Sequence, residues 1–309
     1  MPEHFLKISD HSPEALLKLV QEAVRLKKKG DKSKPLAGKT VALYFAKSST
    51  RTRVAFQAGI FQMGGFSMLL RKDELQLGRG ESHHDTAKVL SRYVDALIVR
   101  TYGHEELEEF AGFSSIPVIN ALTDKYHPCQ AVADYAVLLD KKKGLKGLRL
   151  AYVGDGNNVA NSLMLGGAML GVNVAVATPK GYAPPEDVVE TARRLAKKSG
   201  VKITLTHSPE DAAKGADALY TDVWASMGHE SQIKKRKKDF AGFMVDAKLL
   251  RKAKPGCSVM HCLPAHRGEE ISSEVMDCPA SIVFDQAEYK LHAQKAILKM
   301  CMGGGKKWE

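Results

Sequence analysis

Hydroxyl and guanidinium side chains crowd into one short stretch, Ser-Thr-Arg-Thr-Arg at residues 49–53. The stretch follows an apolar run typical of a strand and opens a run typical of a helix. A helix N-terminus offers free backbone N–H groups and a partial positive charge, which suit a phosphate. Arg51 adds a planar fork that matches a pair of phosphate oxygens. Helix capping alone needs one hydroxyl, and the Walker A glycine spacing is absent. We therefore interpret this stretch as a phosphate site of another kind.

A second group, His127-Pro128-Cys129-Gln130, also lies between a predicted strand and a predicted helix. Proline suits the first position of a helix. A histidine and a glutamine there can donate hydrogen bonds to a carbonyl oxygen or stabilise charge that develops on it. The string alone is weak, because a histidine before a helix more often has a structural role.

Three more runs follow predicted strands in the second half of the chain, at residues 154–158, 222–228 and 261–268. The first, Gly-Asp-Gly-Asn-Asn, lacks the full dinucleotide spacing, and no acidic residue follows the next strand, which disfavours NAD. Asp222 suits a substrate ammonium, whereas Trp224 is equally consistent with core packing. Cys262 is a candidate site thiol. A lone His–Cys pair does not make a zinc site, so we expect no metal.

Short apolar runs alternate with helical patterns along the chain, which predicts parallel βαβ units. The predicted strands are residues 40–46, 65–70, 96–101, 117–121, 149–154, 173–178, 202–207, 218–223, 258–262 and 281–284. The predicted helices are residues 52–63, 84–94, 105–112, 129–142, 159–170, 185–199 and 287–302. A polar, glycine-marked break at 141–147 predicts a boundary between two open parallel-sheet α/β domains. Ligands in such sheets bind beyond the carboxyl ends of the strands, where every motif falls.

The composition of the chain argues against several kinds of partner. The formal net charge of +11 suits anionic substrates or nucleic acid, but no nucleic-acid-binding motif accompanies it, so we expect no nucleic-acid partner. The five cysteines are an odd number without a C-x-x-C pair, which favours reduced thiols in a cytoplasmic protein. No run of about 20 apolar residues and no apolar leader is present, so no membrane partner is expected.

Taken in order and spacing, these motifs resemble the aspartate/ornithine carbamoyltransferase family over essentially the whole chain. The last two motifs point to its ornithine branch, because the aspartate branch is expected to read His-Pro-Leu-Pro-Arg where this chain has His261-Cys262-Leu263-Pro264-Ala265. The resemblance implies a transferase of arginine metabolism that moves a carbamoyl group from carbamoyl phosphate to the side-chain amine of L-ornithine. It implies direct attack, with no cofactor, metal or covalent intermediate.

The resemblance also implies domain and residue roles. Residues 1–143 would bind carbamoyl phosphate, residues 144–286 would bind ornithine, and a C-terminal helix at 287–309 would return to the first domain. The implied carbamoyl-phosphate ligands are Ser49, Thr50, Arg51, Thr52, Gln76, Arg100, His127, Pro128, Cys129, Gln130, Cys262, Leu263 and Lys290. The implied catalytic residues among them are Arg51, Arg100, His127, Gln130 and Cys262. The implied ornithine ligands are Asn158, Asp222, Ser226 and Met227. Gln76 would reach into a neighbouring subunit, which implies a homotrimer or a multiple of it, and Leu263–Pro264 would be a cis bond.

One departure from the family pattern lies in the last helix, where Tyr289 and Lys290 stand in place of the usual Asn and Arg. Lysine keeps the charge and loses the bidentate fork, which predicts a lower affinity for carbamoyl phosphate. Other readings stay open at this point: a carbamoyltransferase for putrescine, an acylated ornithine or aspartate, or a non-catalytic homologue that binds the phosphate ligand. The direction of use, biosynthetic or degradative, is also open.

Overall fold

The structure is a computed structural model that describes residues 3–71, 73, 75–225 and 232–303. The chain divides into two compact units, unit 1 with residues 1–140 and 288–309 and unit 2 with residues 141–287. Each unit is built on its own sheet of parallel strands, so the predicted α/β class is confirmed. No helix within the described residues is both long and apolar enough to cross a membrane.

Unit 1 contains a four-stranded sheet in the order β2-β1-β3-β4. Its strands are β1 Thr40–Phe45, β2 Phe66–Arg71, β3 Ala96–Arg100 and β4 Val118–Leu122. Its helices are η1 Ile8–Asp10, α1 Pro13–Lys29, α2 Thr50–Gln62, η2 Gln76–Arg79, α3 His83–Tyr93, α4 His104–Phe113 and α5 Pro128–Lys142. The chain moves outward from β1 to β2 and then crosses to β3, so the direction of winding reverses between β1 and β3.

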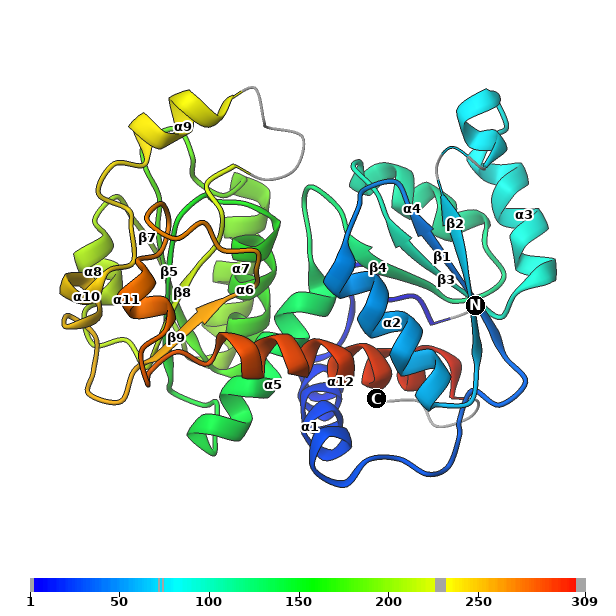
Figure 1. The fold of residues 1–309 in the computed structure, drawn as a ribbon, viewed down its shortest axis with the longest axis horizontal. Coiled ribbons are helices and arrows are strands. Elements are labelled where there is room, and N and C mark those ends of the chain that lie inside the picture. The colour runs from blue at the N-terminus through cyan, green and yellow to red at the C-terminus, as the bar shows by residue number, and fades with distance from the viewer. Residues whose placement is uncertain (1–2, 72, 74, 226–231, 304–309) are drawn as a thin grey trace. The chain divides into compact units, whose positions relative to one another are not determined.

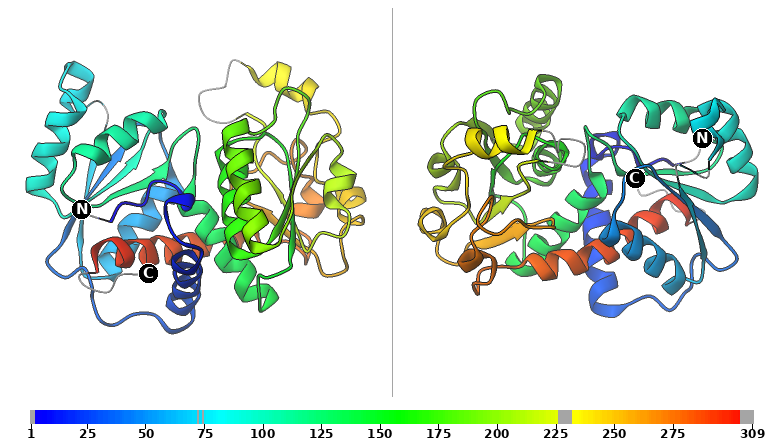
Figure 2. Two further views of the ribbon diagram at one scale, coloured as in Figure 1. Left: turned by 180° about the vertical axis from the view of Figure 1, so that it is seen from behind. Right: turned by 45° about the horizontal axis from the view of Figure 1, so that its top comes forward.

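The helices of unit 1 form two groups. Side chains of α3 and α4 share a core with the sheet residues Ala42, Leu97 and Val99. Figures 1 and 2 show α1, α2 and α12 (Val283–Met302) grouped together, away from α3 and α4. The predicted return of the C-terminal helix to this unit is confirmed, because Lys295 of α12 donates to Gln62 of α2 at 3.0 Å.

Unit 2 contains a five-stranded sheet in the order β7-β6-β5-β8-β9. Its strands are β5 Arg149–Val153, β6 Asn173–Ala177, β7 Ile203–Thr206, β8 Ala218–Thr221 and β9 Ser258–His261. Its helices are α6 Asn158–Leu170, α7 Glu186–Ser199, α8 Pro209–Ala213, α9 Ile233–Asp239, α10 Ala247–Leu250 and α11 Ser273–Met276. Winding reverses between β5 and β8, and α6 packs against α7 (Figure 1). The strands β5, β6 and β8 are buried along nearly their whole length, which explains their near-continuous apolar sequences.

One predicted strand was wrong, and one long helix was not predicted. The predicted strand at 281–284 is not a strand: Ser281 makes one isolated bridge to Val259, and α12 begins at Val283, earlier than the predicted 287. The β-branched Ile282 and Val283 resemble a strand, yet the Ile282 carbonyl already accepts the N–H of Gln286 at 2.8 Å. The helix α1 was missed, although Ser12 caps it, Pro13 occupies its first turn and Gly30 ends it with φ 66°.

Candidate active site

The residue 49–53 stretch lies at the junction of β1 and α2. Ser49 caps α2 by accepting the N–H of Thr52 at 3.3 Å, so one hydroxyl performs the capping. The side-chain oxygen of Thr52 is buried and accepts or donates no hydrogen bond within the described residues. The backbone N–H of Ala46 donates to the Arg100 carbonyl at 2.9 Å, which brings the end of β3 beside this junction. Residues of types that suit a phosphate thus lie at the switch point of the sheet, where open α/β sheets bind ligands.

A cavity of about 480 Å³ opens at the same junction. It is lined by Phe45, Ala46, Ser48, Ser49, Thr50, Arg53, Leu69, Arg71 and Asp73. The preceding Lys47 does not line it: its side chain is buried, pairs with Asp124 and lies 4.1 Å from the ring centre of Tyr102. The loop between β1 and α2 is therefore anchored at Lys47 and presents its hydroxyls beyond that anchor.

Two buried cations surround His127, which precedes α5. Arg100 and His127 are 7% and 4% exposed, and Lys290 of α12 is 5% exposed. Burial, together with the positive charges of Lys290 and Arg100, holds the pKa of His127 well below its ordinary value of 6.5. The imidazole is consequently neutral near pH 7, and a neutral imidazole still carries one N–H that can donate to an oxygen.

Gln130 joins this group through a buried chain of hydrogen bonds. Its amide nitrogen donates to Asp134 at 2.8 Å, and its amide oxygen accepts from the Lys290 ammonium at 2.9 Å. Asp134 and Gln130 lie on the same helix, four residues apart, where side chains are neighbours. The side-chain positions of Gln130 and Lys290 are thus fixed by one network. Tyr289, which also departs from the family pattern, is buried with the Lys27 ammonium 4.6 Å from its ring centre.

The side chain of Cys129 makes its hydrogen bond to the backbone of β4. Its thiol donates to the Asn120 carbonyl at 3.2 Å, and burial raises its pKa to about 12. A thiol with so high a pKa remains protonated and unreactive at neutral pH. Any contact of Cys129 with a substrate would therefore come from its backbone. Pro128 is the first residue of α5, as predicted.

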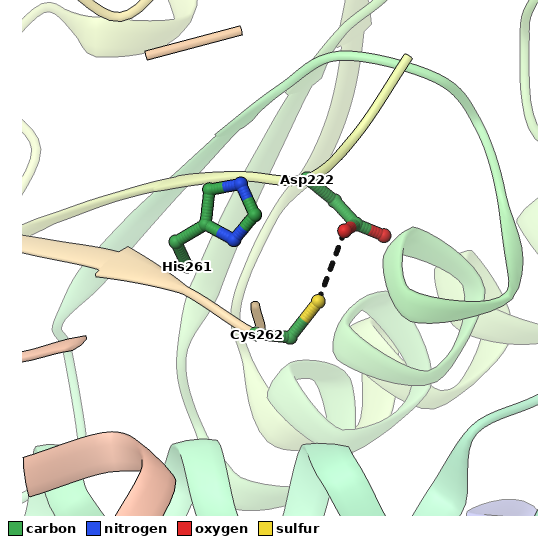
Figure 3. Close-up of side chains that lie close together, drawn as sticks. All are labelled: Asp222, His261 and Cys262. Carbon is green, nitrogen blue, oxygen red and sulfur yellow. Dashed lines mark hydrogen bonds between the residues drawn. The ribbon is translucent and has the colours of Figure 1, made fainter. Parts of the chain in front are cut away.

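Asp222, directly after β8, is the centre of a second cluster in unit 2. Its Oδ1 accepts from the Cys262 thiol at 3.0 Å and from the N–H of Val223 at 2.8 Å. Its Oδ2 accepts from the Asn157 side chain at 2.8 Å. Figure 3 shows the thiol of Cys262 directed at the carboxylate, with His261 beside them. The structure therefore brings together the residues that follow β5, β8 and β9.

His261 completes a group that resembles a metal site, because ligand atoms of Asp222, His261 and Cys262 lie within 4.8 Å of one another. Both ring nitrogens of His261 are engaged, however. Its Nδ1 accepts the N–H of Leu263 at 2.9 Å, and its Nε2 lies 3.0 Å from the buried carboxylate of Glu270. A metal ligand needs a free nitrogen lone pair, so this imidazole is committed to holding the loop after β9.

Other predicted residues of unit 2 take several positions. Asn158 is the first residue of α6 and is buried, and the Leu263–Pro264 bond is cis, as the resemblance implies. Trp224 is 9% exposed and stacks on Phe240 with ring centres 5.6 Å apart, so the core-packing reading holds for it. Ser226 and Met227 lie outside the described residues.

The glycine-containing loop after β5 accommodates the chain's own backbone. A Cβ at Gly156 would lie 2.3 Å from the Pro184 nitrogen, and the Gly156 N–H donates to the Tyr182 carbonyl at 2.9 Å. The space that a dinucleotide pyrophosphate would occupy beside such a glycine is filled by residues 182–184.

Comparison with known families agrees with this architecture. The model described as the aspartate/ornithine carbamoyltransferase carbamoyl-P binding domain matches residues 3–140, and that of the Asp/Orn binding domain matches residues 146–301. The chain therefore belongs to the aspartate/ornithine carbamoyltransferase family, and the resemblance read from the sequence is confirmed.

Its similar relatives are ornithine carbamoyltransferases. The chain is 50% identical to the enzyme of Thermococcus kodakarensis over 97% of this chain and 96% of the relative. It is 49% identical to the Pyrococcus furiosus protein called "Ornithine carbamoyltransferase, anabolic", over 97% of this chain and 96% of the relative. The solved structure of ornithine carbamoyltransferase from Pyrococcus furiosus has a TM-score of 0.95 and 48% identity, and the match covers 99% of this chain and 98% of that one.

Proposed function

We infer that the protein is an ornithine carbamoyltransferase, which converts carbamoyl phosphate and L-ornithine to L-citrulline and phosphate. The observation that carries this conclusion is the similarity to enzymes of that name. About half of all positions are identical, over nearly the whole length of both chains. Conversion in this direction would serve arginine biosynthesis, which the anabolic relative supports.

Unit 1 would bind carbamoyl phosphate. The start of α2 supplies the hydroxyl groups of Ser49, Thr50 and Thr52 and the Arg51 guanidinium, and the unpartnered Thr52 hydroxyl supports this role. Helix N-termini and guanidinium groups both favour a phosphate. Arg100 lies beside this junction because β1 and β3 are neighbours, with Phe45 and Arg100 paired in register.

The carbamoyl group would contact His127 and Gln130. Attack on its carbon places negative charge on the carbonyl oxygen, and donors preorganised around that oxygen lower the barrier. Arg100 offers a full positive charge, and His127, held neutral by its surroundings, offers an N–H without needing a proton from solvent. Lys290 adds a second positive charge and orients Gln130.

Unit 2 would bind ornithine through Asn158, Asp222, Ser226 and Met227, with Cys262 and Leu263 near the reacting groups. The buried Asp222 carboxylate, held by neutral donors, supports pairing with a substrate ammonium. The side-chain amine must lose its proton before attack, because an amine with an ordinary pKa of about 10.4 is almost fully protonated at pH 7. It must then approach the carbamoyl carbon to about 3–3.5 Å.

The assembly would be a homotrimer or a multiple of it. Gln76 supports this proposal, because it lies exposed in the short helix η2, where a neighbouring subunit can be reached. Sedimentation of the purified protein tests the proposal; a monomer at micromolar concentration would contradict it.

An amine panel tests the proposed activity. The purified protein is incubated with carbamoyl phosphate and, separately, ornithine, putrescine, N-acetylornithine and aspartate, and the carbamoylated products are quantified. We expect citrulline from ornithine to dominate. Product from one of the other amines would assign a different carbamoyltransferase, and binding of carbamoyl phosphate without any product would indicate a non-catalytic homologue.

A further inference from the structure

Asn157 lies between β5 and α6, and its side-chain amide has a defined orientation. Its oxygen accepts the N–H groups of Val159 and Ala160 at 2.9 and 3.2 Å, which caps α6. The same oxygen lies 3.3 Å from the Tyr152 hydroxyl, which can donate to it. Because backbone N–H groups only donate, the oxygen must face the helix and the amide nitrogen must face the opposite way.

The nitrogen side of this amide faces Asp222. Asn157 Nδ2 lies 2.8 Å from Asp222 Oδ2, and a carboxylate can only accept. The other carboxylate oxygen is already held by Val223 and Cys262. Both oxygens of a buried carboxylate are thus fixed in direction, with Asn157 acting on one of them.

The loop that carries Asn157 is itself tied to the segment that carries Asp222. One guanidinium nitrogen of Arg236 donates to Asp155 and to the Trp224 carbonyl, both at 2.6 Å. In addition, the Thr221 hydroxyl donates to the Val153 carbonyl at 2.7 Å. These bonds join the ends of β5 and β8 and hold the distance between Asn157 and Asp222.

We propose that Asn157 is a positioning residue that orients the Asp222 carboxylate toward the ammonium of the amine substrate, in addition to capping α6. This inference rests on the proposed function, in which Asp222 binds ornithine. Asn157 does not touch the substrate in this account; it acts through Asp222. The sequence contains the residue within the Gly-Asp-Gly-Asn-Asn run, where only the next residue, Asn158, has an implied substrate role.

The competing account is that Asn157 is a helix cap and nothing more. A serine at this position distinguishes a cap from a positioning residue. Serine caps helices about as effectively as asparagine, but its side chain is too short to reach Asp222 at the same time. In Asn157→Ser we expect the KM for ornithine to rise about tenfold, the size expected for loss of one hydrogen bond to a charged group. The KM for carbamoyl phosphate and the thermal unfolding midpoint should stay near those of the unaltered protein.

Ser272→Ala is the matched control. Ser272 caps α11 in the same unit by accepting the N–H of Val275 at 3.2 Å, and its removal tests loss of a cap alone. We expect this variant to be less stable with an unchanged KM for ornithine. A KM for ornithine in Asn157→Ser that equals that of the unaltered protein would overturn the proposal, as would an equal rise in Ser272→Ala.

Asn157→Asp provides a second readout that does not depend on the size of the side chain. Aspartate also caps helices, yet it turns the donor that faces Asp222 into a second carboxylate. Two carboxylates in hydrogen-bond contact titrate as a coupled pair, one of them with a raised pKa. We therefore expect the pH profile of kcat/KM for ornithine to gain an inflection that the unaltered protein lacks.

Other ionisable groups near Asp222 do not produce that inflection. Cys262 and His261 lie beside it, and Tyr152 interacts with it electrostatically. Asp155 also interacts with Tyr152 and is paired with Arg236. All of these groups are common to the unaltered protein and the variant. Superimposable pH profiles would show that Asn157 is only a cap. If the unaltered protein forms no citrulline, the proposed function is wrong. That result differs from the kinetic results that would overturn the role of Asn157.

Discussion

The two units place opposite charges at equivalent points of two similar sheets. In unit 1 the sheet reverses its winding between β1 and β3, and the residues there are Ser49–Thr52 and Arg100, which suit an anion. In unit 2 the sheet reverses between β5 and β8, and the residues there are Asn157 and Asp222, which suit a cation. The two sheets offer equivalent locations for a site, and the side chains that follow the strands differ in the charge that they suit.

The units also treat their buried groups differently. In unit 1, burial, together with the nearby positive charges of Lys290 and Arg100, lowers the pKa of the His127 imidazole and keeps it neutral. In unit 2, neutral donors gather around one carboxylate, namely a thiol, an amide and a backbone N–H. Each arrangement suits a ligand of opposite charge. A negatively charged ligand would complete unit 1, and a positively charged ligand would complete unit 2. Variants on either side should therefore affect one substrate and spare the other.

Arg100→Met is expected to have the largest effect. The change removes a buried positive charge beside the β1–α2 junction, and kcat/KM for carbamoyl phosphate should fall by about 10²- to 10³-fold, as for loss of one preorganised donor. Steady-state citrulline assays and calorimetric titration with carbamoyl phosphate measure it. Arg92→Met, at an exposed position of α3, is the control and should leave both values unchanged. Carbamoyl phosphate binding that survives in Arg100→Met would break the comparison.

Asp222→Asn is expected to affect the other substrate. The side chain keeps its shape and loses its charge, so the KM for ornithine should rise about 100-fold, the size expected when a charged hydrogen-bonding group is lost. Kinetics with each substrate varied in turn measure the effect, and the calorimetric affinity for carbamoyl phosphate should not change. A normal KM for ornithine would remove Asp222 from the site.

His127 should make the stability of the protein depend on pH. Its pKa lies below the ordinary 6.5 in the folded state, so the unfolded chain binds the proton more readily. The free energy of unfolding therefore decreases as the pH falls below that value, by up to about 1.4 kcal/mol per pH unit for one proton. Denaturant unfolding of His127→Gln and of the unaltered protein between pH 5 and 7 gives the slope of the free energy of unfolding against pH for each. The two slopes should differ by an amount on the order of that for one bound proton.

Four other histidines of unit 1, His4, His11, His104 and His292, also have lowered pKa values because they are buried. For this reason the slope of the free energy of unfolding against pH is compared between variants, because the slope of one protein contains the contributions of all these histidines. The exposed His84 provides the control variant His84→Gln. A slope in His127→Gln equal to that of the unaltered protein would show that His127 keeps an ordinary pKa.

Cys129→Ala is expected to have the smallest effect. Because the thiol faces the Asn120 carbonyl in the core, the KM for carbamoyl phosphate should change by less than about twofold, although stability should decrease as for other core truncations. The buried Cys301 in Cys301→Ala is the matched control. A loss of carbamoyl phosphate affinity specific to Cys129→Ala would return this thiol to the site.

Much of the fold could be predicted from the sequence because the strands are short, apolar and followed by helical periodicity. The exceptions have physical reasons. Ile282 and Val283 are β-branched, apolar and buried at the start of α12, and short apolar runs do not distinguish a strand from a helix start. The helix α1 carries a clear cap and stop, Ser12 and Gly30, so the sequence does contain a signal for this helix.

The types of the candidate site residues could be predicted from the sequence, but the directions of their side chains could not. The sequence identified Gln130 and Lys290 separately, but only the fold shows that they share a hydrogen bond. It identified Cys129 as a neighbour of substrate, whereas the turn of α5 directs its thiol into the core. Asn157 was visible in the sequence, but its role depends on which atom of an amide faces Asp222, and this comes from contacts between separate strands.

The most direct test of the account is transfer of label from carbamoyl phosphate. Carbamoyl phosphate with ¹³C in its carbonyl is mixed with L-ornithine and the purified protein, and the carbon is followed by NMR. We expect the label to appear in the ureido carbon of citrulline at the rate of phosphate release, and omission of ornithine to abolish enzyme-dependent release. Phosphate release that does not need ornithine, or label that never reaches citrulline, would contradict it.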